Sequence, residues 1–182
     1  MLNLCHDADL SDVSRTFRWN VAGMNVAEKL IKLDGTPEAV RYFASICDTL
    51  PDYDYWFFLS TLWVGYSGGV ELDLWKRLFS SDRKHREKCI MKPSELDKFK
   101  QLPWFVTVYR AHRPQETDWI AYTIDPRIAA RFARERGADK VMEYRVKKRD
   151  ILALFLRRNE AEILILNKEK VKFVREIMVI IK

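Results

Sequence analysis

Cysteine, glycine and proline are all scarce in this sequence of 182 residues. The three cysteines, Cys5, Cys47 and Cys89, are too few and too scattered for the disulfide framework of a small secreted domain. Only six glycines and six prolines are present, which excludes a collagen-like or low-complexity chain. Because 48% of the residues are apolar, we expect a globular protein with a well-filled core.

Long hydrophobic runs are also missing. The most apolar stretch, residues 55–64, covers about half of the ~20 residues that a membrane-spanning helix needs. The N-terminus lacks the basic start and apolar stretch of a secretory signal, so we expect a cytoplasmic protein with no membrane partner. His6, His85 and His112 do not combine with the cysteines at zinc-finger spacing, which predicts no metal site.

Positive charge is concentrated in the second half of the chain. Residues 105–182 hold 18 Lys and Arg against 11 Asp and Glu, whereas residues 1–104 hold 14 against 15. A basic excess of this kind attracts phosphate groups, either on a dinucleotide or on nucleic acid. A solvated surface explains the same excess, so charge alone does not decide between these interpretations.

The first hundred residues have the apolar spacing of helices. Thr36-Pro37 has the pattern of an N-cap followed by proline in the first turn, and Gly65 to Gly69 ends an aromatic-rich segment. The expected helices cover residues 20–33, 37–47, 51–64, 71–79 and 94–101. We therefore predict a helical region over residues 1–103.

Strand patterns begin after Pro103. Expected strands cover residues 105–109, 119–124, 140–146, 151–156, 161–166 and 171–181. The segment 151–156 also fits a short helix. Asp125-Pro126 starts the one helix expected among them, and Gly137 ends it. The spacing does not fit a regular βαβ series, so we predict an α+β fold in which a mixed or antiparallel sheet occupies residues 104–182.

Three segments of this second half place polar residues where a strand is expected to be apolar. Arg110 ends the first strand, and Thr123 lies on a short strand just before the capped helix. Glu160 and Glu162 alternate into an aliphatic strand, and the i, i+2 spacing predicts that both point to one face. Two carboxylates at such a short distance repel each other. Their placement together suggests a neighbouring cation, a bound substrate or a catalytic role.

The order of these segments resembles the mono-ADP-ribosyltransferases of the arginine–serine–glutamate group, which includes bacterial toxins and phage enzymes. Tyr109-Arg110 matches the aromatic–arginine pair of that group, and Thr123 stands at its serine motif. Residues 129–133, AARFA, keep its A-x-x-F-A helix pattern, and residues 160–164, EAEIL, match its Glu-x-Glu strand. The resemblance covers roughly residues 104–182. Tyr122-Thr123-Ile124 departs from the usual Ser-Thr-Ser.

The resemblance implies that NAD is the ADP-ribose donor. It assigns Glu162 to the nicotinamide ribose, where a carboxylate stabilises an oxocarbenium-like transition state. It implies that Arg110 binds the cofactor's phosphates or ribose. It also implies that the Thr123 hydroxyl steadies Glu162 or the ribose. Glu160 becomes the base for the incoming nucleophile. Tyr109 and Tyr122 line the cofactor or simply pack the sheet.

The resemblance also implies a macromolecular acceptor, either protein or nucleic acid. Glu160 in the first position of Glu-x-Glu favours an arginine side chain. The loop expected to meet the acceptor contains Phe155, Arg157, Arg158 and Asn159.

Three alternatives remain open on the residues alone. One is a nucleic-acid-binding module without catalysis, using residues 145–149 and 157–158. Another is an interaction protein on a degenerate transferase fold, and a third is an NAD glycohydrolase that uses water as acceptor. By analogy with the enzymes of that group, we expect the protein to act in a toxin system of a bacterial or phage-infected cell.

Overall fold

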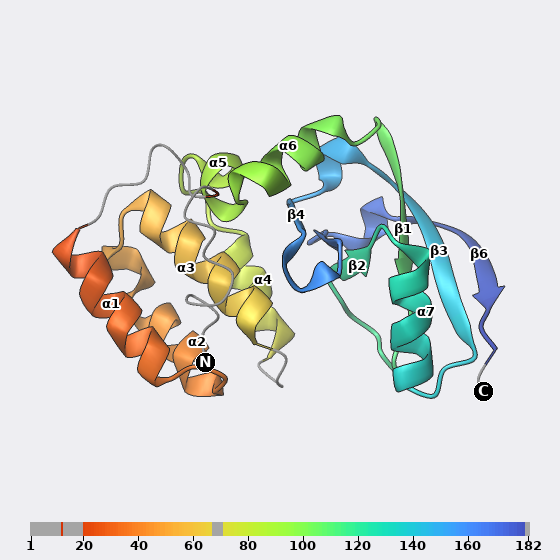
Figure 1. Ribbon diagram of the computed structural model, residues 1–182, viewed down its shortest axis with the longest axis horizontal. Coiled ribbons are helices and arrows are strands. Elements are labelled where there is room, and N and C mark those ends of the chain that lie inside the picture. Colours follow the sequence, from red (N-terminus) through yellow and green to blue (C-terminus); the bar gives the residue numbers. More distant parts are fainter. Residues whose placement is uncertain (1–11, 13–19, 67–70, 181–182) are drawn as a thin grey trace. The chain divides into compact units, whose positions relative to one another are not determined.

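The computed structural model describes residues 12, 20–66 and 71–180 (Figure 1). The chain divides into two compact units, Met1–Leu96 and Asp97–Lys182. This division falls inside helix α6, earlier than the boundary expected after residue 103.

The first unit is helical. Asn20 caps its first helix by accepting a hydrogen bond from the Gly23 backbone N–H at 2.7 Å. Thr36 stands at the predicted N-cap of the second helix, but its hydroxyl donates back to the Leu33 carbonyl oxygen instead of capping. The α-helices that precede the sheet are α1 Val21–Lys32, α2 Pro37–Ile46, α3 Asp52–Gly65, α4 Leu72–Phe79, α5 Arg86–Ile90 and α6 Pro93–Gln101, of which α6 continues into the second unit.

Aromatic side chains fill the core of this unit, as their helical spacing predicted. Phe43 and Trp56 are completely buried, and Tyr55 lies between them with its ring 5.4 Å from Phe43 and 4.9 Å from Trp56. The α3 helix is apolar around most of its circumference, which fits its burial on several sides. The short helix α5 was not predicted, because residues 80–88 have the composition of a solvated loop.

The second unit is built on a six-stranded sheet with the order β4-β5-β2-β1-β3-β6. Every neighbouring pair is antiparallel, which confirms the α+β class with helices first and the sheet later. The strands are β1 Phe105–Arg110, β2 Ala121–Thr123, β3 Lys140–Lys147, β4 Ala153–Phe155, β5 Glu162–Leu164 and β6 Lys172–Met178.

Helix α7, Pro126–Glu135, packs against β1, β2 and β3 (Figure 1). Its N-cap Asp125 accepts a hydrogen bond from the Arg127 backbone N–H at 2.8 Å, as the Asp-Pro pattern predicted. Ala129 and Ala133 are buried against Ala111 and Val141, and their small side chains let the helix approach the sheet closely. The helix therefore fixes the chain directly after Thr123.

Candidate active site

The hydroxyl of Thr123 joins three parts of the second unit. Thr123 is 5% exposed and lies opposite Tyr109 on one side and Glu162 on the other. Its Oγ1 lies 2.7 Å from the Glu160 carbonyl oxygen and 3.3 Å from that of Ala161, and it accepts from the Asp125 backbone N–H at 3.1 Å. The turn before β5, the end of β2 and the start of α7 are thus held at one point.

Glu160 and Glu162 do not alternate on one strand, which corrects the expectation from their spacing. Glu160 has helical backbone angles and follows the 3₁₀ turn Arg157–Asn159, so β5 begins only at Glu162. Ala161 between the two carboxylates has a φ of 43°, in the left-handed region. The i, i+2 rule applies only to extended backbone, and this segment is a turn.

The turn before β5 is locally strained. Besides Ala161, Arg158 and Asn159 have positive φ values of 62° and 54°. A non-glycine residue in the left-handed region costs free energy, and such residues cluster at active sites and ligand clamps. We call residues 157–162, which carry this strain and both glutamates, the carboxylate turn.

Cations surround the first carboxylate of this turn. Arg158 Nη2 lies 2.8 Å from Glu160 Oε1, and Arg131 Nη2 lies 3.9 Å from the same oxygen. The Glu160 side chain is 16% exposed, whereas those of Arg158 and Arg131 are 42% and 46% exposed. Both guanidinium groups are therefore partly open to solvent beside the Glu160 carboxylate.

The predicted acceptor loop is shorter than expected. Phe155 is completely buried in β4, opposite Glu162, so it belongs to the core and not to a loop. Arg157 is half-buried with its guanidinium 4.9 Å from the Phe155 ring centroid. Arg158 and Asn159 are exposed.

Arg110 is held by an internal carboxylate. Its Nε and Nη2 donate to the two carboxylate oxygens of Glu116 at 3.0 and 2.5 Å, and its Nη1 donates to the Ala121 carbonyl oxygen. Both side chains of the ion pair are 13% exposed. The guanidinium edge expected to bind cofactor phosphates is therefore occupied by Glu116 in this structure.

The register of the sheet places Arg110 and Glu162 on opposite faces. Tyr109, Thr123 and Glu162 lie directly opposite one another across β1, β2 and β5, and opposed residues share a face. Arg110 follows Tyr109, so its side chain leaves from the other face, together with Tyr122. The three predicted segments are neighbours in the sheet, but Arg110 does not share a face with the carboxylate turn.

A polar network around Arg110 was not predicted. His112 Nδ1 lies 3.0 Å from Glu116 Oε2, and His112 Nε2 lies 2.7 Å from the Tyr144 hydroxyl. Burial alone raises the pKa of Glu116, but hydrogen bonds from His112 and Arg110 outweigh this effect and lower that pKa to about 2. The sequence contains a signal for this network, because an acidic residue six positions after Arg110 can return to pair with it.

The two predicted tyrosines pack inside the unit. Tyr109 lies against the apolar cluster under α7. Tyr122 is 4% exposed, and its hydroxyl accepts from Trp119 Nε1 at 2.7 Å. Burial raises the pKa of Tyr122 to about 12, so its hydroxyl stays protonated.

No family model, curated protein or solved structure matches this chain.

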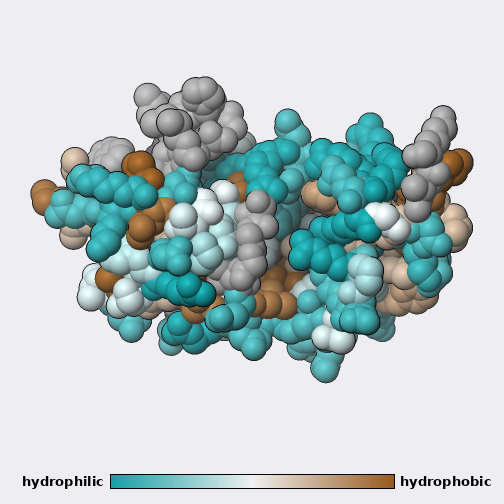
Figure 2. Space-filling model, turned by 90° about the horizontal axis from the view of Figure 1, so that it is seen from below, coloured by the Kyte–Doolittle hydropathy of each residue, from teal (hydrophilic) through white to brown (hydrophobic). Residues whose placement is uncertain are grey.

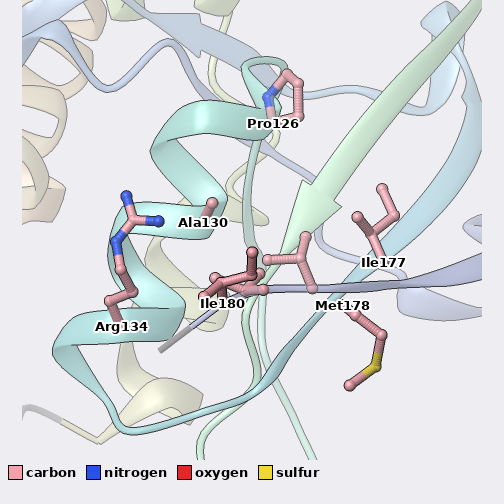
Figure 3. Close-up of a pocket in the computed structure, with 8 residues that line it drawn as sticks. Pro126, Ala130, Arg134, Ile177, Met178 and Ile180 are labelled. Carbon is pink, nitrogen blue, oxygen red and sulfur yellow. The ribbon is translucent and has the colours of Figure 1, made fainter. Parts of the chain in front are cut away.

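An apolar pocket lies elsewhere on the second unit. It has a volume of about 340 Å³ and is lined by α7 and the end of β6, with Ala130, Ile177 and Ile180 on its wall and Arg134 at its side (Figure 3). None of the predicted site residues lines it. Most of the surface drawn in Figure 2 is hydrophilic, and apolar surface occurs there in separate patches.

In the part of the chain that the structure describes, metal-ligand clusters and membrane-spanning helices are both absent. No group of three or more His, Cys, Asp or Glu side chains there is arranged to hold a metal ion. Within the same residues, every helix is too short or too polar to cross a bilayer.

Proposed function

We propose that this protein is an NAD-dependent mono-ADP-ribosyltransferase whose carboxylate turn carries the chemistry. The observation that carries the proposal is the hydrogen bonding of the buried Thr123 hydroxyl to the backbone carbonyl oxygens of Glu160 and Ala161, in the carboxylate turn. The sequence resemblance implied that Thr123 steadies Glu162 or the ribose, and these hydrogen bonds hold the backbone that leads into Glu162. The backbone strain in the same turn supports a functional role.

Glu162 is the carboxylate assigned to the reacting ribose. As the bond from the ribose to the nicotinamide nitrogen breaks, its electron pair leaves with nicotinamide and positive charge develops on the sugar. A fixed carboxylate stabilises this charge most strongly in the transition state. Glu160 accepts the proton of the acceptor nucleophile as the new bond to the ribose forms.

The charges around the turn suit an anionic dinucleotide. Arg131 and Arg158 are half-exposed and lie beside Glu160, so we assign the pyrophosphate contacts to them. Arg110 then acts as a positioning residue, because its guanidinium holds the Ala121 carbonyl oxygen in the strand that carries Thr123. Direct contact between Arg110 and the cofactor would require the Glu116 pair to open.

The test is incubation of the purified protein with labelled NAD and a bacterial lysate. Nicotinamide release shows cleavage, and separate analysis of the protein and nucleic-acid fractions identifies the acceptor. ADP-ribose that stays free in solution would show an NAD glycohydrolase instead. Absence of both NAD binding and nicotinamide release would overturn the proposal in favour of a non-catalytic module.

A further inference from the structure

The face of the sheet beyond α7 is basic. Cross-strand register brings Phe105 beside Lys147, then Thr107 beside Arg145 and Lys172, in successive rows on one face of β1, β3 and β6. Tyr109, in the next row, already lies under α7. We call the first two of these rows the basic sheet face.

Most of these side chains are accessible. Phe105 is 42% exposed, Thr107, Arg145 and Lys172 are exposed, and Lys147 is half-buried. Among the described residues, none forms an ion pair with Arg145, Lys147 or Lys172 at 4.0 Å or less. Cations gathered without carboxylates repel one another, and an anionic ligand relieves that repulsion.

Neighbouring acidic groups do not neutralise this face. Glu143 in the next row is bound to Arg175, whose Nε lies 2.9 Å from Glu143 Oε2. Glu162 lies on β5, which β2 and β1 separate from β3 in the sheet. The carboxylates of the carboxylate turn therefore do not lie on the basic sheet face, where they would repel a phosphate backbone.

We propose that the basic sheet face binds single-stranded nucleic acid. Three cations on one face of the sheet attract the phosphates of an extended strand. The Arg145 guanidinium lies over the Phe105 ring, 4.7 Å from its centroid, so the aromatic group and a cation are in contact on this face. An exposed aromatic ring beside cations is the combination on which unpaired bases stack. The inference goes beyond the proposed NAD chemistry and does not depend on it.

The experiment measures binding of a fluorescent uridine RNA of about twelve nucleotides to the full chain, without NAD, between 50 and 200 mM salt. In the charge-reversal variant Arg145→Glu, Lys147→Glu, Lys172→Glu we expect at least tenfold weaker binding. Each phosphate contact contributes about 0.7 to the salt slope in single strands, so the loss of three should reduce that slope by about 2.

The matched control is Lys84→Glu, Arg86→Glu, Lys88→Glu, which changes three exposed cations of the first unit and gives the same net charge. It should keep wild-type binding within about threefold if the local face matters more than total charge. A neutral variant, Arg145→Gln, Lys147→Gln, Lys172→Gln, should also lose binding. This second variant keeps the test valid if charge reversal disturbs folding.

Several results would overturn the inference. They are the absence of RNA binding by the wild type at 50 mM salt, equal losses in the two charge-reversal variants, and equal affinity for a duplex of the same length. Equal affinity for a polyglutamate peptide would assign the face to acidic proteins instead.

Discussion

The Thr123 hydroxyl forms hydrogen bonds with the carbonyl oxygens of Glu160 and Ala161 and with the backbone N–H of Asp125. All three groups lie outside β2, the strand that carries Thr123. The contribution of the hydroxyl is therefore to hold together segments far apart in the chain. Thr123 is 5% exposed, so water cannot easily replace the hydroxyl if it is removed. This single side chain links the stability of the unit to the geometry of the carboxylate turn.

Replacing Thr123 with valine should lower the free energy of unfolding by about 1–3 kcal/mol, because it leaves buried polar groups without a partner. Chemical denaturation measures this loss. Thr123→Ser, which retains the hydroxyl, should restore most of the stability and any NAD turnover. A valine variant as stable as the wild type would show that the hydroxyl does not hold the turn.

Glu162→Gln should reduce nicotinamide release by on the order of 10²-fold or more, because the amide removes the charge that stabilises the transition state. Circular dichroism and the melting temperature should stay close to those of the wild type, since the amide is nearly the same size and shape. The assay is nicotinamide release from NAD under saturating conditions. Turnover at the wild-type rate would remove Glu162 from the mechanism.

At the scale of elements, the sequence predicted all six strands of the sheet but not the carboxylate turn. Aliphatic residues at 163–165 give a clear strand signal, and the strand is present as β5. The left-handed conformations of Arg158 and Ala161 have no such signal, because neither residue favours positive φ. They depend on contacts such as that of Thr123, which form only in the folded chain.

The pairing register was equally inaccessible from the sequence. Alternation shows that Tyr109 and Arg110 point to opposite faces of β1, but it does not show which of them shares a face with Glu162. That depends on the register of β1 with β2 and of β2 with β5. The segments of the candidate site were therefore predicted as neighbours, and the relative orientation of their side chains was not.

The segment between β1 and β2 is clamped by the Arg110–Glu116 pair, which should make stability depend on acid pH. The pKa of Glu116 is lowered from the usual 4.5 to about 2, so the pair stabilises the folded state fully above about pH 4.5. That contribution is lost progressively as the pH falls towards 2. Urea denaturation of the wild type and of Glu116→Gln at several pH values measures the effect.

Glu116→Gln should be less stable than the wild type at pH 7 and should approach it at pH 2–3, where the wild-type carboxyl begins to protonate. A constant difference across this range would show that the lost stability comes from packing and not from the ionised carboxylate.

At the scale of the whole molecule, each unit has its own buried core, which suggests two partly independent unfolding events. Phe43 is completely buried in the helical unit, and Phe43→Ala should destabilise that unit by about 3–5 kcal/mol through loss of burial and a residual cavity. Differential scanning calorimetry should show one transition moving to lower temperature while the other stays in place. A single transition that moves as a whole would mean that the two units unfold as one.

The bulge between β3 and β6 also bears on how this protein behaves at high concentration. Glu143 pairs with Arg175 and Tyr144 with Phe173, so Val174 is an extra residue on the outer strand of the sheet. Phe173, Val174 and Met178 are exposed there, and a regular edge with such residues would invite another chain to add a strand. Because the extra residue interrupts the spacing of the free backbone groups, an incoming strand finds no continuous ladder, and we expect this apolar outer edge to resist self-association.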